Sequence, residues 1–234
     1  MPMKAKSEAL RDGRDRGSSS KAGPAAGSKR LPHAERRAQI LATAAEFFAE
    51  NGLTAQTRAL ANECGVSQRL LYRFFPAKED LLEAVYKEEI LGPFKMSWFA
   101  GLQDRSRPAE ERLIRFYQEY MDAVLTRRWL RLFLYASLAE AGMAPEYIST
   151  VITQLMEVLV REVAAEKELS LPDDTAALHE MGWTLHGAIS HYAIRRHLYH
   201  TSQVLPEDKV IAMHVRTFIA GFESMVRDYA EHLD

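Results

Sequence analysis

Four polar side chains that could bind nucleic acid lie close together in the stretch from Ser67 to Phe75. At about 100° per residue, one arc of a helix over this stretch carries Gln68, Arg69, Tyr72 and Arg73. The opposite arc carries Leu70, Leu71, Phe74 and Phe75. Guanidinium and amide groups can bond base edges, and phenol and guanidinium groups can bond phosphate oxygens. An ordinary amphipathic helix with a solvated face would show the same division, so the flanking residues must decide.

The flanking residues predict two short helices with a sharp turn between them. Leu60 and Ala61 face inward from the first helix, and Gly65 supplies the turn. Ser67 can cap the second helix, because its hydroxyl accepts a bond from an unpaired amide of the first turn. Phe75-Pro76 ends that helix, since proline disfavours a helical residue before it. This is a helix-turn-helix pattern over about residues 56–75.

A wider stretch, residues 36–86, resembles the N-terminal DNA-binding domain of the TetR family of bacterial transcriptional regulators. The matching segments are I-L-A-T-A-A-E-F-F-A-E-N-G at 40–52, A-L-A-N-E-C-G-V-S at 59–67 and L-Y-R-F-F-P-A-K-E-D-L at 71–81. The joint spacing of the three segments is specific, although it covers roughly a quarter of the chain.

The resemblance implies that two such domains in a dimer place their recognition helices in successive major grooves of a near-palindromic operator. The positions that resemble base-reading residues are Arg58, Gln68, Arg69 and Arg73, and those that resemble phosphate contacts are Tyr72 and Lys78. The segment from Gly52 to Leu60 is one residue shorter than is usual in the family, so either Gln56 or Thr57 could cap the first helix of the motif.

The fold expected from these patterns is all-α: an N-terminal three-helix domain with the helix-turn-helix, then a C-terminal helical bundle that binds a ligand and dimerises. Residues 1–32 are rich in Ser, Gly, Lys and Arg and predict a disordered basic tail. The DNA-binding domain is expected over 33–93 and the effector-binding and dimerisation domain over 94–234. Helical periodicity predicts helices over 34–50, 77–91, 108–126, 128–141, 145–167, 173–200 and 206–232.

The charge distribution fits this division. Residues 1–80 hold 14 Lys and Arg against 9 Asp and Glu, whereas residues 81–234 hold 16 against 23. A basic N-terminal part suits a polyanion such as double-stranded DNA. Cys64 is the single cysteine and is expected to be a small packed residue rather than a redox sensor. The sequence shows no signal peptide and no apolar run of about 18 residues, so we expect a cytoplasmic protein that does not bind membranes.

No catalytic spacing is found among the phosphate-binding, nucleophile-elbow, dinucleotide-binding and zinc-protease motifs, and we expect no enzymatic activity. His197 and His200 are three residues apart, but no carboxylate lies three or four residues from them within that helix. We therefore expect neither a metal nor another cofactor.

The C-terminal helices interleave aromatic and polar residues, which suits an apolar cavity with a few polar anchors. The candidate effector contacts are Tyr117, Tyr120, Phe133, Trp183 and His186, although such a stripe also suits plain core. The last two helices carry small residues and are the candidate homodimer face. The function expected is a dimeric repressor that an unidentified small molecule releases from its operator, with the helix over 77–91 carrying the change. The alternative is an effector-independent regulator or an architectural DNA protein of the same fold.

Overall fold

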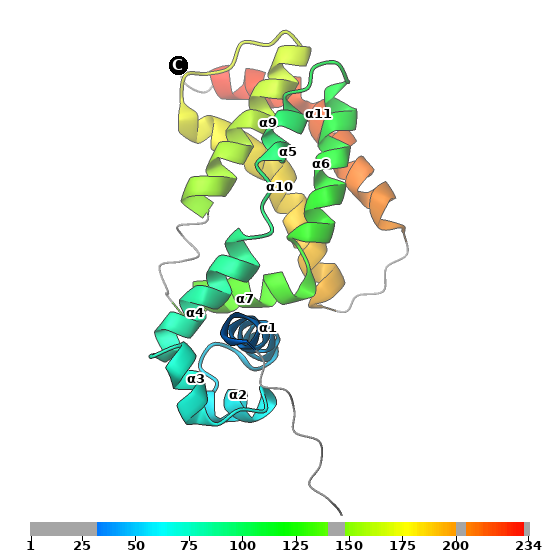
Figure 1. Ribbon diagram of the computed structural model, residues 1–234. Helices are drawn as coiled ribbons and strands as arrows, with labels where there is room; N and C mark the ends of the chain where they lie inside the picture. The colour runs from blue at the N-terminus through cyan, green and yellow to red at the C-terminus, as the bar shows by residue number, and fades with distance from the viewer. Residues whose placement is uncertain (1–31, 140–147, 200–204, 232–234) are drawn as a thin grey trace, which may run out of the picture. The chain divides into compact units, whose positions relative to one another are not determined.

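The computed structural model describes residues 32–139, 148–199 and 205–231 (Figure 1). Helices make up the regular structure of these ranges, and no strand occurs in them. The all-α prediction is therefore confirmed. The prediction of a disordered tail falls, apart from Pro32, outside the described residues. In the described part, no helix combines the length and hydropathy that crossing a bilayer requires.

The first three helices are α1 (His33–Asn51), α2 (Thr57–Glu63) and α3 (Gln68–Phe74). Two glycines separate them: Gly52 has φ +80° after α1, and Gly65 has φ +63° between α2 and α3. Both values lie in the left-handed region that favours glycine, which explains where the helices end. Ser67 caps α3 as expected, since its hydroxyl accepts a bond from the amide of Leu70 at 3.1 Å.

The fourth helix has two parts. α4 (Lys78–Tyr86) begins after Pro76, and the Asp80 carboxylate accepts a bond from the amide of Ala77 at 2.9 Å. The chain then continues as the π-helical turn η1 (Lys87–Leu91), where the sequence predicted an uninterrupted α-helix to Leu91. η1 ends at Leu91, and Gly92 follows it.

The C-terminal part contains the predicted helices with shorter ends and one helix that was not predicted. They are α5 (Ser97–Leu102), α6 (Ala109–Ala123), α7 (Arg127–Leu138), η2 (Ile148–Ile152), α9 (Thr153–Glu166), α10 (Thr175–His197) and α11 (Glu207–Glu231). The unpredicted helix is α5, which is only six residues long and lacks a side-chain cap. The start predicted at residue 145 lies outside the described residues.

The bundle core is closely packed where α9 meets α10. A Cβ placed on Gly182 of α10 would lie 2.6 Å from the Cβ of Met156 on α9, closer than real Cβ contacts allow. Glycine at this position therefore lets the two helix backbones approach each other. Leu155 and Leu159 of α9 and Leu185 of α10 are buried in the same core.

An aromatic group lies at the centre of the bundle, between α6 and α10. The His186 ring lies 5.3 Å from Trp183, 5.5 Å from Tyr120 and 6.0 Å from Tyr117, measured between ring centroids. The Tyr117 hydroxyl and His186 Nδ1 are 3.4 Å apart. Burial lowers the pKa of His186 to about 4, because an imidazolium would lose its hydration there. His186 is consequently neutral at physiological pH.

This histidine makes the stability of the fold depend on pH. Between pH 6.5 and about 4 the unfolded chain binds a proton at His186 that the folded chain does not, so unfolding becomes easier as the pH falls. We predict that this residue removes about 3 kcal/mol from the free energy of unfolding between about pH 7 and pH 4. The measurement is urea denaturation of the wild type and of His186→Gln across this range. The difference between the two free energies should shrink as the pH falls, and a constant difference would contradict a buried neutral imidazole.

A second stability prediction concerns α3. Leu71 is 1% exposed and belongs to the core that α3 shares with α1 and α2. Leu71→Ala should lower the free energy of unfolding by about 2–5 kcal/mol, because it leaves a cavity in a packed core. Leu138→Ala is the matched control, since Leu138 is 81% exposed and its truncation should change stability by less than about 0.5 kcal/mol. Equal losses for the two variants would be inconsistent with the burial of Leu71.

Candidate nucleic-acid interface and effector cavity

The two faces predicted for α3 are present in the structure. Gln68, Arg69, Tyr72 and Arg73 are exposed, whereas Leu71 and Phe75 are buried with exposures of 1% and 3%. Leu70 and Phe74 lie at the boundary and are half-buried. The polar face of α3 is therefore accessible to a partner, and its apolar face packs on the rest of the motif.

Thr57 joins α2 to the polar face of α3. Its hydroxyl accepts a bond from the Gln68 amide at 3.2 Å and lies 3.0 Å from the Tyr72 hydroxyl. The Thr57 side chain is 8% exposed, so these bonds are partly shielded from water. They hold the amide and the phenol in fixed positions on the surface. Gln56 occupies the cap position of α2 without a side-chain bond, which settles the alternative that the sequence left open.

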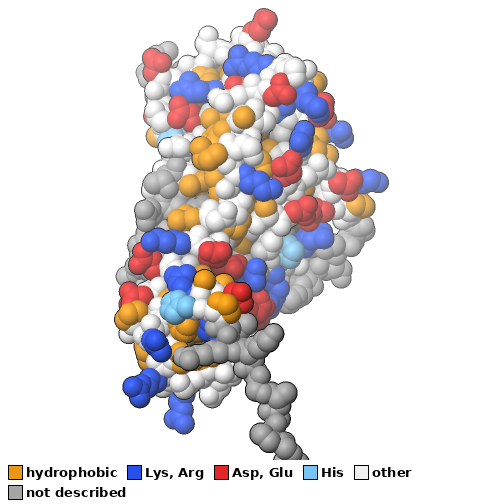
Figure 2. Space-filling model, viewed as in Figure 1, with side chains coloured by type: hydrophobic (Ala, Val, Ile, Leu, Met, Phe, Trp, Pro, Cys, Tyr) orange, Lys and Arg blue, Asp and Glu red, His pale blue; other side chains and the backbone are white. Residues whose placement is uncertain are grey.

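The arginines of the motif are not neutralised by neighbouring carboxylates. Within the described ranges, no Asp or Glu lies within 4.0 Å of the guanidinium groups of Arg58, Arg69 or Arg73 to form an ion pair. All three side chains are exposed. In Figure 2, Lys and Arg side chains project from the end of the molecule where Figure 1 places α2 and α3. This surface can accept anionic groups without first breaking an ion pair.

Lys78 lies beside this surface but already has a partner. Its ammonium group donates to the carbonyl of Ala55 at 2.8 Å and lies 5.8 Å from the ring centroid of Phe48. The residue is half-buried. An ammonium group has three N–H donors, so binding Ala55 leaves Lys78 able to contact a phosphate as well. In this structure, the bond from Lys78 to Ala55 holds the loop between α1 and α2.

Cys64 is buried at 8% exposure in the core near α2. Burial raises the pKa of its thiol, which lowers the fraction of reactive thiolate. Among the described residues, no group of three or more His, Cys, Asp or Glu is arranged to hold a metal ion. His200 lies outside those residues.

Four of the five predicted effector contacts come together and one does not. Tyr117, Tyr120, Trp183 and His186 form the aromatic group in the bundle core. Phe133 instead stacks on Trp129 of α7, with ring centroids 4.7 Å apart and planes at 12°. Tyr117 and Tyr120 are fully buried, so a ligand could reach them only after side chains move.

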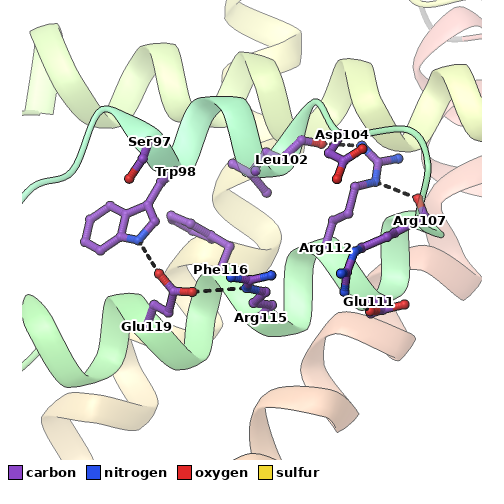
Figure 3. Close-up of a pocket in the computed structure, with 11 residues that line it drawn as sticks. Ser97, Trp98, Leu102, Asp104, Arg107, Glu111, Arg112, Arg115, Phe116 and Glu119 are labelled. Atoms are coloured by element: carbon purple, nitrogen blue, oxygen red, sulfur yellow. Dashed lines mark hydrogen bonds and ion pairs between the residues drawn. The ribbon is translucent and has the colours of Figure 1, made fainter.

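A cavity that the sequence did not predict lies between α5 and α6 (Figure 3). Its volume is about 180 Å³. Trp98, Leu102 and Phe116 form its apolar part, and the charged residues around them are Asp104, Arg107, Glu111, Arg112, Arg115 and Glu119. Trp98 Nε1 donates to the Glu119 carboxylate at 2.9 Å, and this bond together with Arg115 lowers the pKa of Glu119.

One side of the cavity is held by a buried ion pair. Arg112 is 4% exposed and contacts Glu162 of α9 at 2.8 Å. Glu162 also accepts two bonds from Arg105 at 3.0 Å each, and the bond from Arg105 is the main cause of its lowered pKa. The loop between α5 and α6 is thereby fixed to α9. Sequence analysis missed this cavity because α5 gives only a short and uncapped apolar pattern.

Comparisons with known proteins agree with this geometry. The family model described as bacterial regulatory proteins of the tetR family matches residues 40–85. The chain is 33% identical over 92 residues to the HTH-type transcriptional repressor KstR2 of Rhodococcus jostii (strain RHA1), which is 38% of this chain and 44% of that protein. It is 38% identical over 71 residues to the HTH-type transcriptional activator FasR of Mycolicibacterium smegmatis, which is 29% of this chain and 32% of that protein.

The chain thus matches less than half of the length of these two relatives. The similarity in fold covers more of the chain than the similarity in sequence. A TetR-like transcriptional regulator from Rhodococcus sp. RHA1 has a crystal structure that superposes with a TM-score of 0.62 at 19% identity, over 83% of this chain and 99% of that one. Residues 40–85 thus match the tetR family of bacterial regulatory proteins, and the all-helical fold of the chain is similar to that of a TetR-like regulator.

Proposed function

We propose that this protein is a DNA-binding transcriptional regulator that binds a near-palindromic operator as a dimer. The observation that carries the proposal is the polar face of α3, where Arg69 and Arg73 are exposed and free of carboxylate partners in the described part of the chain. Many of the other arginines in this protein form an ion pair with a carboxylate. Arginines without such partners on a capped recognition helix suit contacts with guanine and phosphate.

The contacts divide by chemistry. Arg69 and Arg73 would read guanine edges and Gln68 an adenine edge, because bidentate donors and acceptors match these bases in the major groove. Tyr72 would bond a phosphate oxygen, with Thr57 holding its phenol in place. Arg58 in the first turn of α2 and Lys78 in the first turn of α4 would contact DNA at the two sides of α3.

We assign the dimer face to α10 and α11. Small residues leave open space there: a Cβ on Gly187 or Gly221 would meet no atom within 4 Å. A groove of about 250 Å³ runs between the two helices, lined by Thr184, Ala188, His214, Thr217, Phe218, Gly221 and Met225. His214 Nε2 is buried in this region without a hydrogen-bond partner among the described residues. A second copy packed on the groove would cover its apolar surface.

We place DNA binding in residues 33–93 and effector binding in residues 94–234. The cavity between α5 and α6 offers an apolar floor with charged groups around it, which suits a small ligand that has both apolar and polar parts. Its volume of about 180 Å³ is below the 300–1,000 Å³ that is typical of drug-sized ligands. An effector would therefore be small, or its binding would move side chains so that the cavity extends toward the aromatic group of Tyr117, Tyr120, Trp183 and His186.

The alternative, a regulator or architectural protein without an effector, draws support from the same core. Tyr117, Tyr120 and His186 fill the centre of the bundle. Their aromatic side chains are therefore explained by core packing, without a ligand cavity. The two curated relatives are a repressor and an activator. We propose repression, with release by an effector, as the first mechanism to test.

The first test of this function concerns α3. Arg69→Ala and Arg73→Ala should each reduce the affinity for a selected operator by about 5–150-fold, which corresponds to losing about 1–3 kcal/mol of base contact. Their melting temperatures should remain within about 2 °C of the wild type, because both side chains are exposed. Gel-shift titration at two salt concentrations measures the affinities.

Arg161→Ala is the matched control for this test, since Arg161 is an exposed arginine of α9 far from the motif in sequence. It should bind the operator like the wild type. Unchanged operator binding by both α3 variants would rule out the polar face of α3 as the reading surface.

A second test separates the two candidate mechanisms. A small molecule that binds the folded protein at 100 times its Kd adds about 2.7 kcal/mol to the free energy of unfolding and raises the melting temperature. We predict that a thermal-shift screen will find such a compound and that the same compound will weaken operator binding. A screen in which stabilising compounds leave operator binding unchanged would favour the effector-independent regulator.

A further inference from the structure

Three arginines of α7 contact the C-terminal end of α1. Arg127 contacts both carboxylate oxygens of Glu50, one of them at 3.1 Å. Arg131 donates to the backbone carbonyls of Ala49 and Glu50, the second at 3.1 Å. Arg128 lies 3.6 Å from the Glu46 carboxylate. We call Arg127, Arg128 and Arg131 the α7 arginines.

The end of a helix is a favourable place for these contacts. The last four carbonyls of an α-helix lack partners within the helix, and the helix dipole places partial negative charge there. Arg131 satisfies two of these carbonyls of α1, and the Arg127 guanidinium lowers the pKa of Glu50 through its hydrogen bond. The contacts therefore fix the direction of α1 as well as its position, because guanidinium groups bond in a planar, directional way.

The α7 arginines also reach the segment that leaves α4. Arg128 contacts the Glu89 carboxylate of η1 at 3.0 Å, so one guanidinium joins α7, α1 and η1. Next to it, Trp129 Nε1 donates to the carbonyl of Ile90 at 3.3 Å. A π-helical turn such as η1 interrupts regular helix geometry and often lies where a helix changes direction. α7 therefore holds α1, which precedes the helix-turn-helix, and η1, which follows α4.

A tyrosine completes the junction. The Tyr135 hydroxyl accepts a bond from Arg131 at 2.9 Å, and its ring lies 3.8 Å from where a Cβ on Gly52 would stand. Gly52 has φ +80° and directs the chain from α1 toward α2. The turn that starts the helix-turn-helix therefore packs against the same side chain that supports Arg131.

On its other side α7 belongs to the bundle. α7 contacts α10 of the bundle as well as α1 and η1, whereas its buried residues Leu132 and Ala136 line a small pocket with residues of α4 and η1. α1 in turn contacts α2, which contacts α3. A change in the angle of α7 would therefore change the angle of α3, and in a dimer it would change the distance between the two recognition helices.

We infer that the α7 arginines are positioning residues that set which operator spacing the dimer reads. This inference rests on the proposed function, and it assigns to α7 and α1 a role that the sequence suggested for the helix over 77–91 alone. The ion pairs of Arg127 and Arg128 are partly exposed and contribute little to stability, so these two residues can be replaced without unfolding the protein. The α7 arginines fix the orientation of α1. The wild-type dimer therefore binds operators with one half-site spacing, and a dimer without these contacts binds operators with several spacings.

The experiment compares affinities for one selected operator whose two half-sites are moved apart or together in steps of one base pair. For the wild type, a change of one base pair should lower affinity by at least about tenfold, since it rotates and shifts one half-site relative to the other. Arg127→Glu places a carboxylate opposite Glu50 and should reduce this loss to about threefold or less. Adding Glu50→Arg restores the ion pair with its charges exchanged and should restore the wild-type spacing profile.

Two controls separate positioning from general damage. Arg161→Glu changes an exposed arginine of α9 in the same way and should keep the wild-type profile. Melting temperatures and affinity for a single half-site should be similar in all variants, because the α3 surface is unchanged. An Arg127→Glu profile as narrow as that of the wild type would overturn the inference. So would a double variant that stays broad while it melts like the wild type. If the wild type selects no operator at all, the proposed function itself fails.

Discussion

The structure depends on the burial of one side of a seven-residue helix. Leu71 of α3 and Phe75, the residue that follows this helix, are buried, and their burial fixes the rotation of α3 about its axis. With the apolar side fixed, Gln68, Arg69, Tyr72 and Arg73 have no direction left except outward. Burying a leucine contributes about 1.5–3 kcal/mol, more than any single exposed polar contact on the other side could offset. The chemistry of the surface is thus a consequence of the packing beneath it.

Rigidity of this surface comes from partners outside α3. Thr57 holds Gln68 and Tyr72 from the side of α2, and Lys78 holds the loop before α2 through the carbonyl of Ala55. α1 supports both short helices and is itself fixed at its C-terminal end by α7. Since side chains that bind DNA must be held before contact to lose little entropy on binding, these supporting bonds are as important to recognition as the arginines themselves.

Helical periodicity and turn residues were sufficient to predict the local features. The two faces of α3, the Ser67 cap and the turn at Gly65 follow from rules that act over a few residues. Contacts between distant segments could not be predicted in this way. Arg127 and Glu50 are 77 residues apart, and Lys78 bonds a carbonyl 23 residues earlier, so neither pair is visible in a local pattern. The cavity was missed because α5 is short, and Phe133 was grouped with Tyr117 because spacing alone does not show which core a buried ring joins.

Protection of guanine N7 from methylation in the bound operator would show whether the polar face of α3 reads the bases. N7 lies in the major groove and is the atom that a bidentate arginine occupies, together with O6. We expect two clusters of protected guanines about one helical turn apart. Both clusters should lose their protection when Arg69 and Arg73 are replaced by alanine. Stable binding to the operator with every guanine N7 still reactive would contradict it, because the protein would then hold DNA by some surface other than the polar face of α3.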